Sequence, residues 1–449
     1  MINLRFASWK VLFQVLEKNQ FSHLELQKLF KEEKELEARD RAFIERVVRG
    51  TLEHLYEINS WINHFSRVPV SKLKPAIRVN LQQSVYQILF MDSVPDRAVC
   101  NEAVKLAEKT GFRTLKGYVN GVLRTIGREH TNGFHPWKDI SQGEKLLGLK
   151  YSMPEWIIKR FVTMFGYEKA ETIFQCFGNP VRLAVYRNKN RITSEELKKN
   201  LTMAGADPEP LPYGLNGFYL NHGADLERLR DFQDGNFMIQ DISSMIQGLI
   251  TSAGQNQCVF DVCAAPGGKS IHAAIDMQGS GMVYSFDVSE YKTSMIRENA
   301  ERMQIRNIRI SVQDATVFNP ELENKADILI ADLPCSGLGI IGRKPEIRYN
   351  IREKDIQELA FLQKKILDTV WKYVKPGGRL VYSTCTLSME EDEENFRYLT
   401  EKLPFDAESL EPYCTDDLIC PTKSLGYMKL IPGDFSGDGF FIGSAIRRK

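Results

Sequence analysis

The sequence has little of what marks secreted, membrane-spanning or metal-binding chains. Eight cysteines in 449 residues are too few and too scattered for a disulfide framework, so we expect reduced thiols. No cysteine pair has zinc spacing and the seven histidines are dispersed, so we expect no metal site. No uncharged run approaches the roughly 18 apolar residues that span a bilayer, and the amino terminus is charged throughout, unlike a signal peptide. We therefore expect a cytoplasmic protein without a membrane partner.

A large net charge is also absent, but the charge is unevenly distributed. The whole chain carries 59 Lys and Arg against 58 Asp and Glu, a net charge of +1. Residues 1–150 contain 24 Lys and Arg against 17 Asp and Glu, a net charge of +7. The remainder therefore contains 59 − 24 = 35 basic and 58 − 17 = 41 acidic residues, a net charge of −6. A basic front part favours a polyanionic partner. On charge alone, a merely solvated basic surface explains it equally well.

The length favours two or three domains. Residues 1–135 have apolar residues at three and four spacings and no β-branched runs, which predicts a helical bundle. The aperiodic stretch at 130–137 contains Gly and Pro and is a candidate linker. Residues 140–235 mix helices with short strand-like runs, at 181–187 and 217–221, and predict a small α/β module whose function the residues do not indicate.

From residue 236 to 449, short apolar strands alternate with helical stretches, which predicts a doubly wound, Rossmann-like α/β domain with a parallel sheet. One amphipathic helix is expected from about Glu353 to Val374, ending at Pro376-Gly377-Gly378. The predicted strands are 258–264, 281–289, 307–315, 326–334 and 378–386.

Ligands of such sheets bind at the carboxyl ends of the strands, and the unusual residues lie there. After the first strand come Cys263, Ala264, Ala265, Pro266, Gly267, Gly268 and Lys269, a turn of small residues that opens a helix and lets a ligand approach the backbone. A tight strand-to-helix turn needs glycine anyway, so this turn alone is weak support.

Three carboxylates strengthen the prediction, because Asp287, Asp314 and Asp332 end the next three strands, where they can accept hydrogen bonds from ribose and base. Each one separately could be a helix cap or a turn former. The loop has neither the G-x-G-x-x-G spacing that suits a pyrophosphate nor Walker spacing. A cofactor without phosphates, such as S-adenosylmethionine, fits better.

Two cysteines stand apart from the others because they follow the fourth and fifth strands at the same edge. They are Cys335 in ADLPCSGLG and Cys385 in YSTCTLS. Carbon 5 of cytosine is a poor nucleophile, and adding a thiolate to carbon 6 converts the ring to a reactive enamine. Asp332 could hydrogen-bond ring nitrogen 3 and favour that addition, and a base must later remove the carbon 5 proton. The acidic run from Glu390 to Glu394 is predicted to be a helix start, since Ser388 and Glu391 have capping-box spacing.

These motifs resemble those of the RNA 5-methylcytosine methyltransferases. The resemblance is carried by DVCAAPGGK (261–269), PCSG (334–337), STC (383–385) and DGFF (438–441). It implies that Cys385 is the nucleophile, that Cys335 assists release, and that S-adenosylmethionine contacts Cys263 through Lys269, Asp287, Asp314 and Asp332. The helical region, with DRAFIERVVRG (40–50), CNEAVKLAEK (100–109) and GYVNGVLR (117–124), resembles the NusB-like RNA-binding domain of the RsmB (Sun) family.

The resemblance implies methylation of cytosine carbon 5 in small-subunit (16S) ribosomal RNA by a monomer that does not act on DNA. A transfer RNA 5-methylcytosine methyltransferase would show the same catalytic motifs. A non-catalytic, NusB-like RNA-binding assembly factor is a further alternative, and the presence of both Cys335 and Cys385 argues against it. A nicotinamide-dependent oxidoreductase is disfavoured by the missing pyrophosphate loop.

Overall fold

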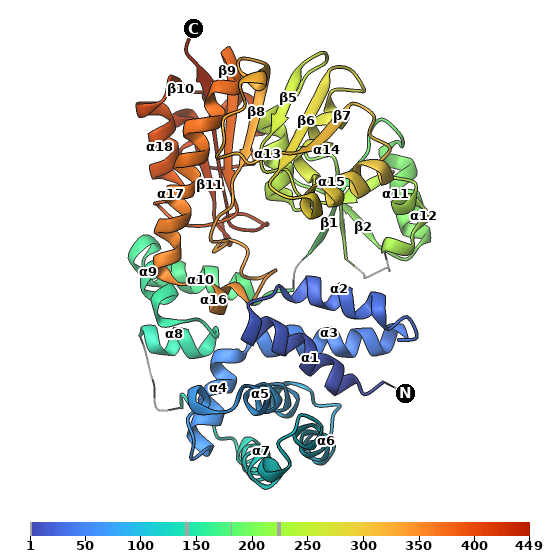
Figure 1. Cartoon of the computed structure of the whole chain (residues 1–449), viewed down its shortest axis with the longest axis vertical. Helices are drawn as coiled ribbons and strands as arrows, with labels where there is room; N and C mark the ends of the chain where they lie inside the picture. Colours follow the sequence, from blue (N-terminus) through green and yellow to red (C-terminus); the bar gives the residue numbers. More distant parts are fainter. Residues whose placement is uncertain (1, 139, 141–142, 181, 222–225) are drawn as a thin grey trace. The chain divides into compact units, whose positions relative to one another are not determined.

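A computed structural model describes residues 2–138, 140, 143–180, 182–221 and 226–449. The chain forms two compact units, and Figure 1 gives the labels of their elements. Unit 1 comprises residues 1–179 together with 341–353, and unit 2 comprises residues 180–340 and 354–449. No helix among the described residues is long and apolar enough to cross a membrane.

Unit 1 is helical, as predicted for residues 1–135. Its helices are α1 (Leu4–Lys18), α2 (Ser22–Glu32), α3 (Ala38–Glu53), α4 (Leu55–Phe65), α5 (Pro75–Phe90), α6 (Asp96–Lys109), α7 (Lys116–Thr131), α8 (Glu144–Lys150), α9 (Glu155–Phe165), α10 (Tyr167–Gly178) and α16 (Ile347–Asn350), with short 3-10 turns η1 (Val70–Lys72) and η2 (Arg113–Leu115).

Helix α5 is the central helix of the bundle. It begins at Pro75, because proline lacks the amide hydrogen that the first helical turn does not use. Nearly all of its side chains are buried, including Asn80 and Gln83, and apolar side chains of α4, α6 and α7 pack around it. The stretch predicted as a linker is partly packed, since Phe134 contacts Trp61 at a ring distance of 5.3 Å.

The segment Ile341–Glu353, which follows the PCSG motif, folds as part of unit 1. The Glu346 side chain is fully buried, and its Oε1 accepts hydrogen bonds from the backbone amide and the hydroxyl of Ser22 at 2.9 and 3.0 Å. Arg348 donates to the backbone oxygen of Glu53 at 3.0 Å. A buried acid and a buried arginine with partners from α2 and α3 make this segment an integral part of the helical unit.

The module expected at 140–235 is divided between the two units at Asn179 and Pro180. Helices α8 to α10 join unit 1 because Ile157, Phe161 and Phe174 form their own apolar layer there. The strands join unit 2, since Tyr186 and Met238 belong to the same buried cluster as Val259 and Ile330 of the large sheet described below. Val181, the first residue of the predicted strand 181–187, lies outside the described residues.

Unit 2 holds two sheets. The small antiparallel sheet has the order β2-β3-β1-β4, and the large sheet has the order β10-β12-β9-β8-β5-β6-β7, with β11 paired to β12. The strands are β1 (Leu183–Arg187), β2 (Pro208–Pro210), β3 (Gly217–Leu220), β4 (Phe237–Ile239), β5 (Cys258–Asp261), β6 (Met282–Asp287), β7 (Ile308–Val312), β8 (Ala326–Asp332), β9 (Val374–Thr384), β10 (Phe405–Ala407), β11 (Tyr427–Leu430) and β12 (Phe440–Arg447).

Each of the five predicted strands is present, shortened at one or both ends, and β5 to β9 run parallel. Near the end of the chain, β11 and β12 form an antiparallel pair, and the DGFF motif leads into β12. Helix α17 ends earlier than predicted, at Val370, and β9 already begins at Val374. Pro376 and Gly377 lie in an irregularity of β9, where the residues paired with β8 change from Val374 to Arg379. Such a bulge tolerates proline and glycine, which regular strand pairing does not favour.

Helices cover both faces of the large sheet, as expected of a doubly wound fold. They are α13 (Ile242–Thr251), α14 (Gly268–Asp276), α15 (Glu290–Arg302), α17 (Glu353–Val370) and α18 (Glu393–Lys402), with the shorter α12 (Arg230–Gln233) and the 3-10 turns η3 (Leu226–Arg228), η4 (Pro320–Leu322), η5 (Trp371–Tyr373), η6 (Glu411–Tyr413) and η7 (Lys423–Leu425) elsewhere in the unit.

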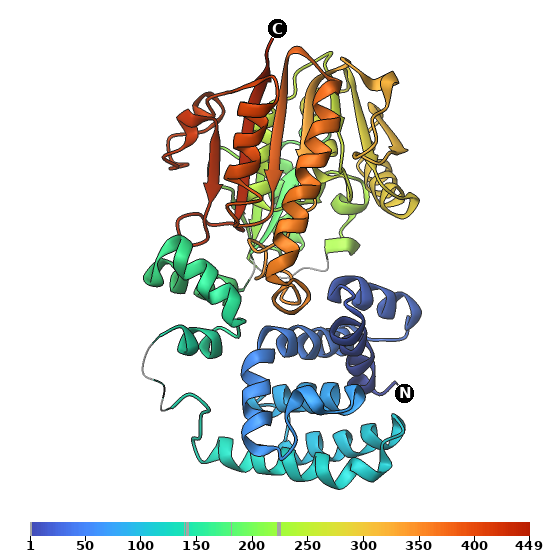
Figure 2. The ribbon, with the colours of Figure 1, turned by 60° about the vertical axis from the view of Figure 1, so that its left-hand side comes forward.

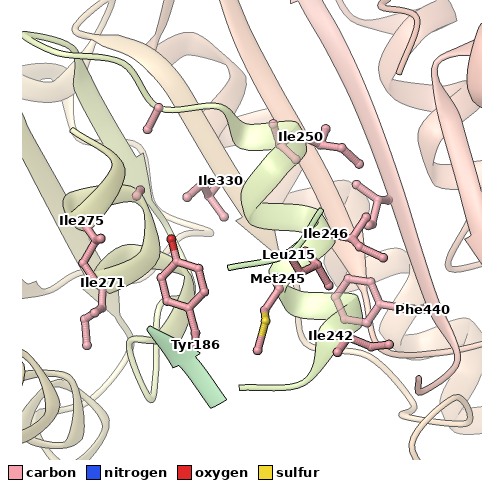
Figure 3. Packing of buried hydrophobic residues seen from close by; sticks show 14 of the residues in the cluster. Tyr186, Leu215, Ile242, Met245, Ile246, Ile250, Ile271, Ile275, Ile330 and Phe440 are labelled. Carbon is pink, nitrogen blue, oxygen red and sulfur yellow. The ribbon is translucent and has the colours of Figure 1, made fainter. Parts of the chain in front are cut away.

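Alternate residues of the central strands face opposite cores. Val259 and Ile330 pack against α13 and α14, and Figure 3 shows Ile330 beside these helices. Phe260 and Leu329 pack against α17 and α18, which lie together over one face in Figure 2. On the α13 side, Tyr186 of β1 stacks on His272 of α14 at 4.0 Å, and this contact joins the small sheet to the large one.

The strand order places a topological switch point between β5 and β8. From β5 the chain builds outward through β6 and β7, and it then returns to place β8 on the other side of β5. In doubly wound folds, ligands bind outside the carboxyl ends of the strands at such a point. The loops after β5, β8 and β9 therefore meet at the edge where a ligand is expected.

Candidate active site

The small-residue loop after β5 is held close to the neighbouring strand β6. The Ala264 amide donates to the backbone oxygen of Phe286 at 2.9 Å, and the Ala265 amide donates to Asp287 Oδ2 at 3.0 Å. Gly267 has φ +104°, and a Cβ there would lie 3.1 Å from Cγ2 of Ile296. Glycine is therefore required at this turn, which leads into α14 at Gly268. The Pro266 carbonyl accepts from Asn299 at 3.0 Å.

Asp287 is buried at the end of β6, and one of its hydrogen bonds holds the loop. Besides accepting from Ala265, its carboxylate accepts from the Val288 amide at 2.8 Å and lies 3.1 Å from Lys292 Nζ. An ionised carboxylate has about four acceptor positions, so one remains for a ribose hydroxyl. Asp287 thus shapes the loop in addition to any contact with a cofactor.

Asp314 lies beyond the end of β7 and is exposed. Its Oδ1 accepts from the amide and the hydroxyl of Thr316, both at 2.8 Å, and these bonds lower the pKa of its carboxyl group. Asp314 is thus a turn former, which is one of the alternative roles that the sequence allowed for it. The Gln313 amide donates to the backbone oxygen of Asp287 at 3.0 Å, so Asp314 follows directly after the residue that joins the two strand ends.

A buried carboxylate lies beneath the loop. Burial raises the pKa of Asp261 to about 7, and the hydrogen bond from Ser270 at 2.7 Å opposes that rise. Its other oxygen, Oδ1, has no hydrogen-bond partner among the described residues. Burial also raises the pKa of the Cys263 thiol, and the nearby Asp287 adds to the effect. A loop of small residues, an acid at the end of β6 and an unpartnered acceptor fit the polar amino-acid and ribose groups of S-adenosylmethionine.

The Lys269 side chain reaches from the loop to the end of β8. Its Nζ lies 2.6 Å from Asp332 Oδ2 at the end of β8, while Asp332 Oδ1 accepts from the Ser383 hydroxyl of β9 at 2.7 Å. Burial alone would lower the pKa of the Lys269 ammonium group. The nearby Asp332 carboxylate more than offsets this effect, so the pKa is raised and the ammonium form is favoured. Asp332 is thus fixed between a cation and a hydroxyl.

The two cysteines singled out by the sequence are brought together. The Sγ atoms of Cys335 and Cys385 lie 3.2 Å apart, and both residues remain partly accessible. The contact with Cys385, together with burial, raises the pKa of the Cys335 thiol. A thiol that keeps its proton is a poor nucleophile, and it can donate or exchange that proton.

The acidic run begins a helix, as predicted, with Glu393 and Glu394 in the first turn, but the predicted capping box between Ser388 and Glu391 does not form. Helix α18 begins at Glu393, Ser388 bonds to Glu390, and Glu391 points inward to accept hydrogen bonds from Ser336. Asp392 is buried, accepts from Thr384 at 2.6 Å, and has its pKa raised by burial to about 7. The capping-box spacing was misleading because it indicates only distance along the chain. The apolar residues on either side, Leu387 and Phe396, were the available signal that this run turns into the core.

No group of three or more His, Cys, Asp or Glu side chains within the described ranges is arranged to hold a metal ion.

Comparisons with known proteins agree with this arrangement. Residues 249–446 match the family described as 16S rRNA methyltransferase RsmB/F, and residues 3–128 match the NusB family. A probable ribosomal RNA small subunit methyltransferase B of Bacillus subtilis is 34% identical over 438 residues, 97% of this chain and 96% of that one. A probable methyltransferase of the same description from Synechocystis is 29% identical, covering 98% and 99%.

The crystal structure of PH0851 superimposes with a TM-score of 0.85 at 24% identity over 100% of this chain and 99% of that one, a likeness of fold. A methyltransferase homologue from Pyrococcus horikoshii covers 69% of this chain and all of its own, with a TM-score of 0.59 at 25% identity. The near-complete relationship to the Bacillus subtilis protein extends through both units. The chain belongs to the 16S rRNA methyltransferase RsmB/F family and is an S-adenosylmethionine-dependent methyltransferase.

Proposed function

We propose that the protein methylates carbon 5 of a cytosine in small-subunit ribosomal RNA through a covalent adduct with Cys385. The observation that carries the proposal is the pair of thiols 3.2 Å apart beside the Lys269–Asp332 ion pair. A methyltransferase acting on oxygen or nitrogen needs no thiol, whereas activation of carbon 5 requires a nucleophile on carbon 6. We further propose that it acts as a monomer in the cytoplasm, on RNA rather than on DNA or at a membrane.

The residues divide the reaction between them. The Cys385 thiolate forms a bond to carbon 6, and Asp332 hydrogen-bonds the cytosine edge, held in place by Lys269 and Ser383. S-adenosylmethionine, held by the loop 263–269 with Asp287 and Asp314, supplies the methyl group that carbon 5 attacks. A base then removes the carbon 5 proton, the carbon 6–sulfur bond breaks, and Cys335 exchanges a proton with the departing Cys385 thiolate.

Bisulfite sequencing tests the substrate assignment. RNA from cells with and without the gene should differ at a cytosine of small-subunit ribosomal RNA, and purified protein should restore the methyl group to that position in vitro. Loss of methylation from a transfer RNA instead would assign the alternative substrate. Unchanged methylation in both RNA classes would contradict the proposal.

Removal of the Asp287 carboxylate is expected to weaken S-adenosylmethionine binding by about 1–3 kcal/mol, the cost of leaving donors without a charged acceptor. Asp287→Asn should lose less than Asp287→Ala, because the amide oxygen can still accept from Ala265. Isothermal calorimetry gives both dissociation constants, and RNA affinity serves as the control because it should not change. Equal and unchanged cofactor affinity in both variants would remove Asp287 from the site.

We propose that the helical unit supplies RNA affinity. A hollow between α1 and α2 is lined by Trp9, Phe13, Lys10 and Lys28, an aromatic and basic combination that suits nucleic acid, although Glu25 and Glu32 also line it. This proposal should be tested in the full chain. Removing the helical unit would take away Ser22 and Glu53, the partners of the buried Glu346 and Arg348.

Replacing Lys10 and Lys28 with Ala should weaken RNA binding and make it less sensitive to salt. The log-log slope of affinity against salt should fall by about 0.7 for each phosphate that the protein no longer neutralises. The matched control is Lys198→Ala with Lys199→Ala, two exposed lysines of α11 (Ser194–Met203) in unit 2. Equal slopes for the two double variants would mean that this part of the helical unit does not contact phosphate.

A further inference from the structure

The two peptide groups that flank Cys335 are each held by a buried side chain from another part of unit 2. Gln363 of α17 donates through Nε2 to the Pro334 carbonyl oxygen at 2.9 Å. Glu391 accepts from the Ser336 amide at 2.8 Å through Oε1 and from the Ser336 hydroxyl at 2.5 Å through Oε2. The backbone is therefore fixed on both sides of the thiol.

Gln363 and Glu391 are themselves fixed by contacts that do not involve the Cys335 loop. The two side chains are hydrogen-bonded to each other at 3.2 Å, and both residues are fully buried. Asn395 donates to Gln363 Oε1 at 2.6 Å, and the Tyr382 hydroxyl donates to the same oxygen at 3.2 Å. Gln363 and Glu391 thus form a rigid unit, hereafter the clamp.

The clamp also reaches the loop that carries Cys385. The Ser336 hydroxyl lies 2.7 Å from Oγ1 of Thr386, which accepts from the Leu338 amide at 3.2 Å. The Gly339 amide donates to the carbonyl oxygen of Cys385 at 3.2 Å. Since the residues that follow each cysteine are bonded to each other, the distance between the two thiols depends on where the clamp holds Ser336.

Holding a loop with a buried carboxylate costs free energy of folding. Desolvation opposes its charge, and well-packed apolar residues are often as stable as a buried charged group. Glu391 is satisfied by three donors, and two of them belong to Ser336, the residue next to Cys335. An arrangement this specific restricts geometry more than it adds to stability.

We propose that Glu391 and Gln363 are positioning residues that hold the Cys335 thiol against Cys385 and so control release of the methylated base. The proposal rests on the roles given above to Cys385 and Cys335. Glu391 and Gln363 both act through the backbone on either side of Cys335.

Glu391→Gln should retain the side-chain volume but place an amide nitrogen against the donors of Ser336. The expected result is a fall in kcat of about tenfold to a hundredfold, since displacements on the order of 1 Å can cost about 10²-fold. S-adenosylmethionine affinity and the KM for RNA should stay unchanged. An RNA–protein adduct should accumulate on denaturing gels, as in Cys335→Ala, because release is slowed and attack is not.

Glu394→Gln is the matched control, because it makes the same change in the same acidic run at an exposed position. Gln363→Met is a second variant that removes the donor to Pro334 while preserving the length of the side chain, and it should behave like Glu391→Gln. Unchanged cofactor affinity and thermal midpoint show that each variant is folded.

A second readout measures the geometry without the reaction. Diamide takes two electrons and two protons from a pair of thiols to form a disulfide, and peptide mass spectrometry follows the Cys335–Cys385 link in protein without RNA. Glu391→Gln and Gln363→Met should form it more slowly than wild type and Glu394→Gln, by on the order of tenfold if the thiols are no longer held together.

The outcomes separate the clamp from the proposed function. Wild-type oxidation rates and no adduct in both clamp variants would overturn the clamp, even if Cys335→Ala accumulates adduct. If Cys335→Ala itself forms no adduct, the role given to Cys335 in release fails and this inference fails with it. Slow oxidation with adduct accumulation in both clamp variants supports the clamp.

Discussion

Cys385→Ala is expected to reduce methyl transfer by several powers of ten while leaving S-adenosylmethionine affinity nearly unchanged, because the thiolate acts on the base and not on the cofactor. The structure supports this separation. Cys385 follows β9, whereas the proposed cofactor loop follows β5. Asp332 connects the two regions, because it pairs with Lys269 of the loop and accepts a hydrogen bond from Ser383 of β9.

The measurement is single-turnover methyl transfer to small-subunit ribosomal RNA, with calorimetry of the cofactor alongside it. Cys420→Ala is a suitable control, because this cysteine is also partly accessible but lies outside the site. Residual turnover of Cys385→Ala above about one per cent would contradict a covalent role, since the loss of a nucleophile costs far more.

The sequence predicted which residues meet at the carboxyl edge of the sheet because each of its signals was local. Strands with continuous apolar runs place the residue that follows them at the carboxyl edge of a parallel sheet, whatever the rest of the fold does. Asp332, Cys335 and Cys385 therefore could be assigned to one edge before any contact was known. The 3.2 Å separation of the two thiols could not, because it depends on Ser336 and Thr386 meeting across two loops.

The features that the sequence missed depend on contacts between distant residues. Glu391 has capping-box spacing with Ser388, but its partners are Ser336 and Gln363, which are 55 and 28 residues away. Asp287 and Lys269 were predicted to contact the cofactor, and their bonds to Ala265 and Asp332 give them further structural and electrostatic roles that spacing does not reveal. The division of residues 140–235 at Asn179 likewise follows from packing rather than from composition.

Cys335→Ala is expected to trap the RNA on the protein through Cys385. The methyl group should be transferred once, and the adduct should then persist because the group that exchanges a proton with the departing thiolate is missing. The raised pKa of Cys335 supports this role, since a thiol that keeps its proton is a poor nucleophile and an available proton donor. Multiple-turnover activity should fall by orders of magnitude, while a single methyl transfer per protein remains detectable.

Denaturing gels with labelled RNA distinguish the two cysteines, because a covalent complex keeps its shifted mobility and a non-covalent one does not. The band should appear in Cys335→Ala, be absent from the double variant Cys335→Ala with Cys385→Ala, and yield a peptide containing Cys385 after digestion. A shifted band in Cys385→Ala and none in Cys335→Ala would reverse the roles. The 3.2 Å contact is compatible with either direction of proton exchange, so the site of the adduct decides which of the two thiols attacks the base.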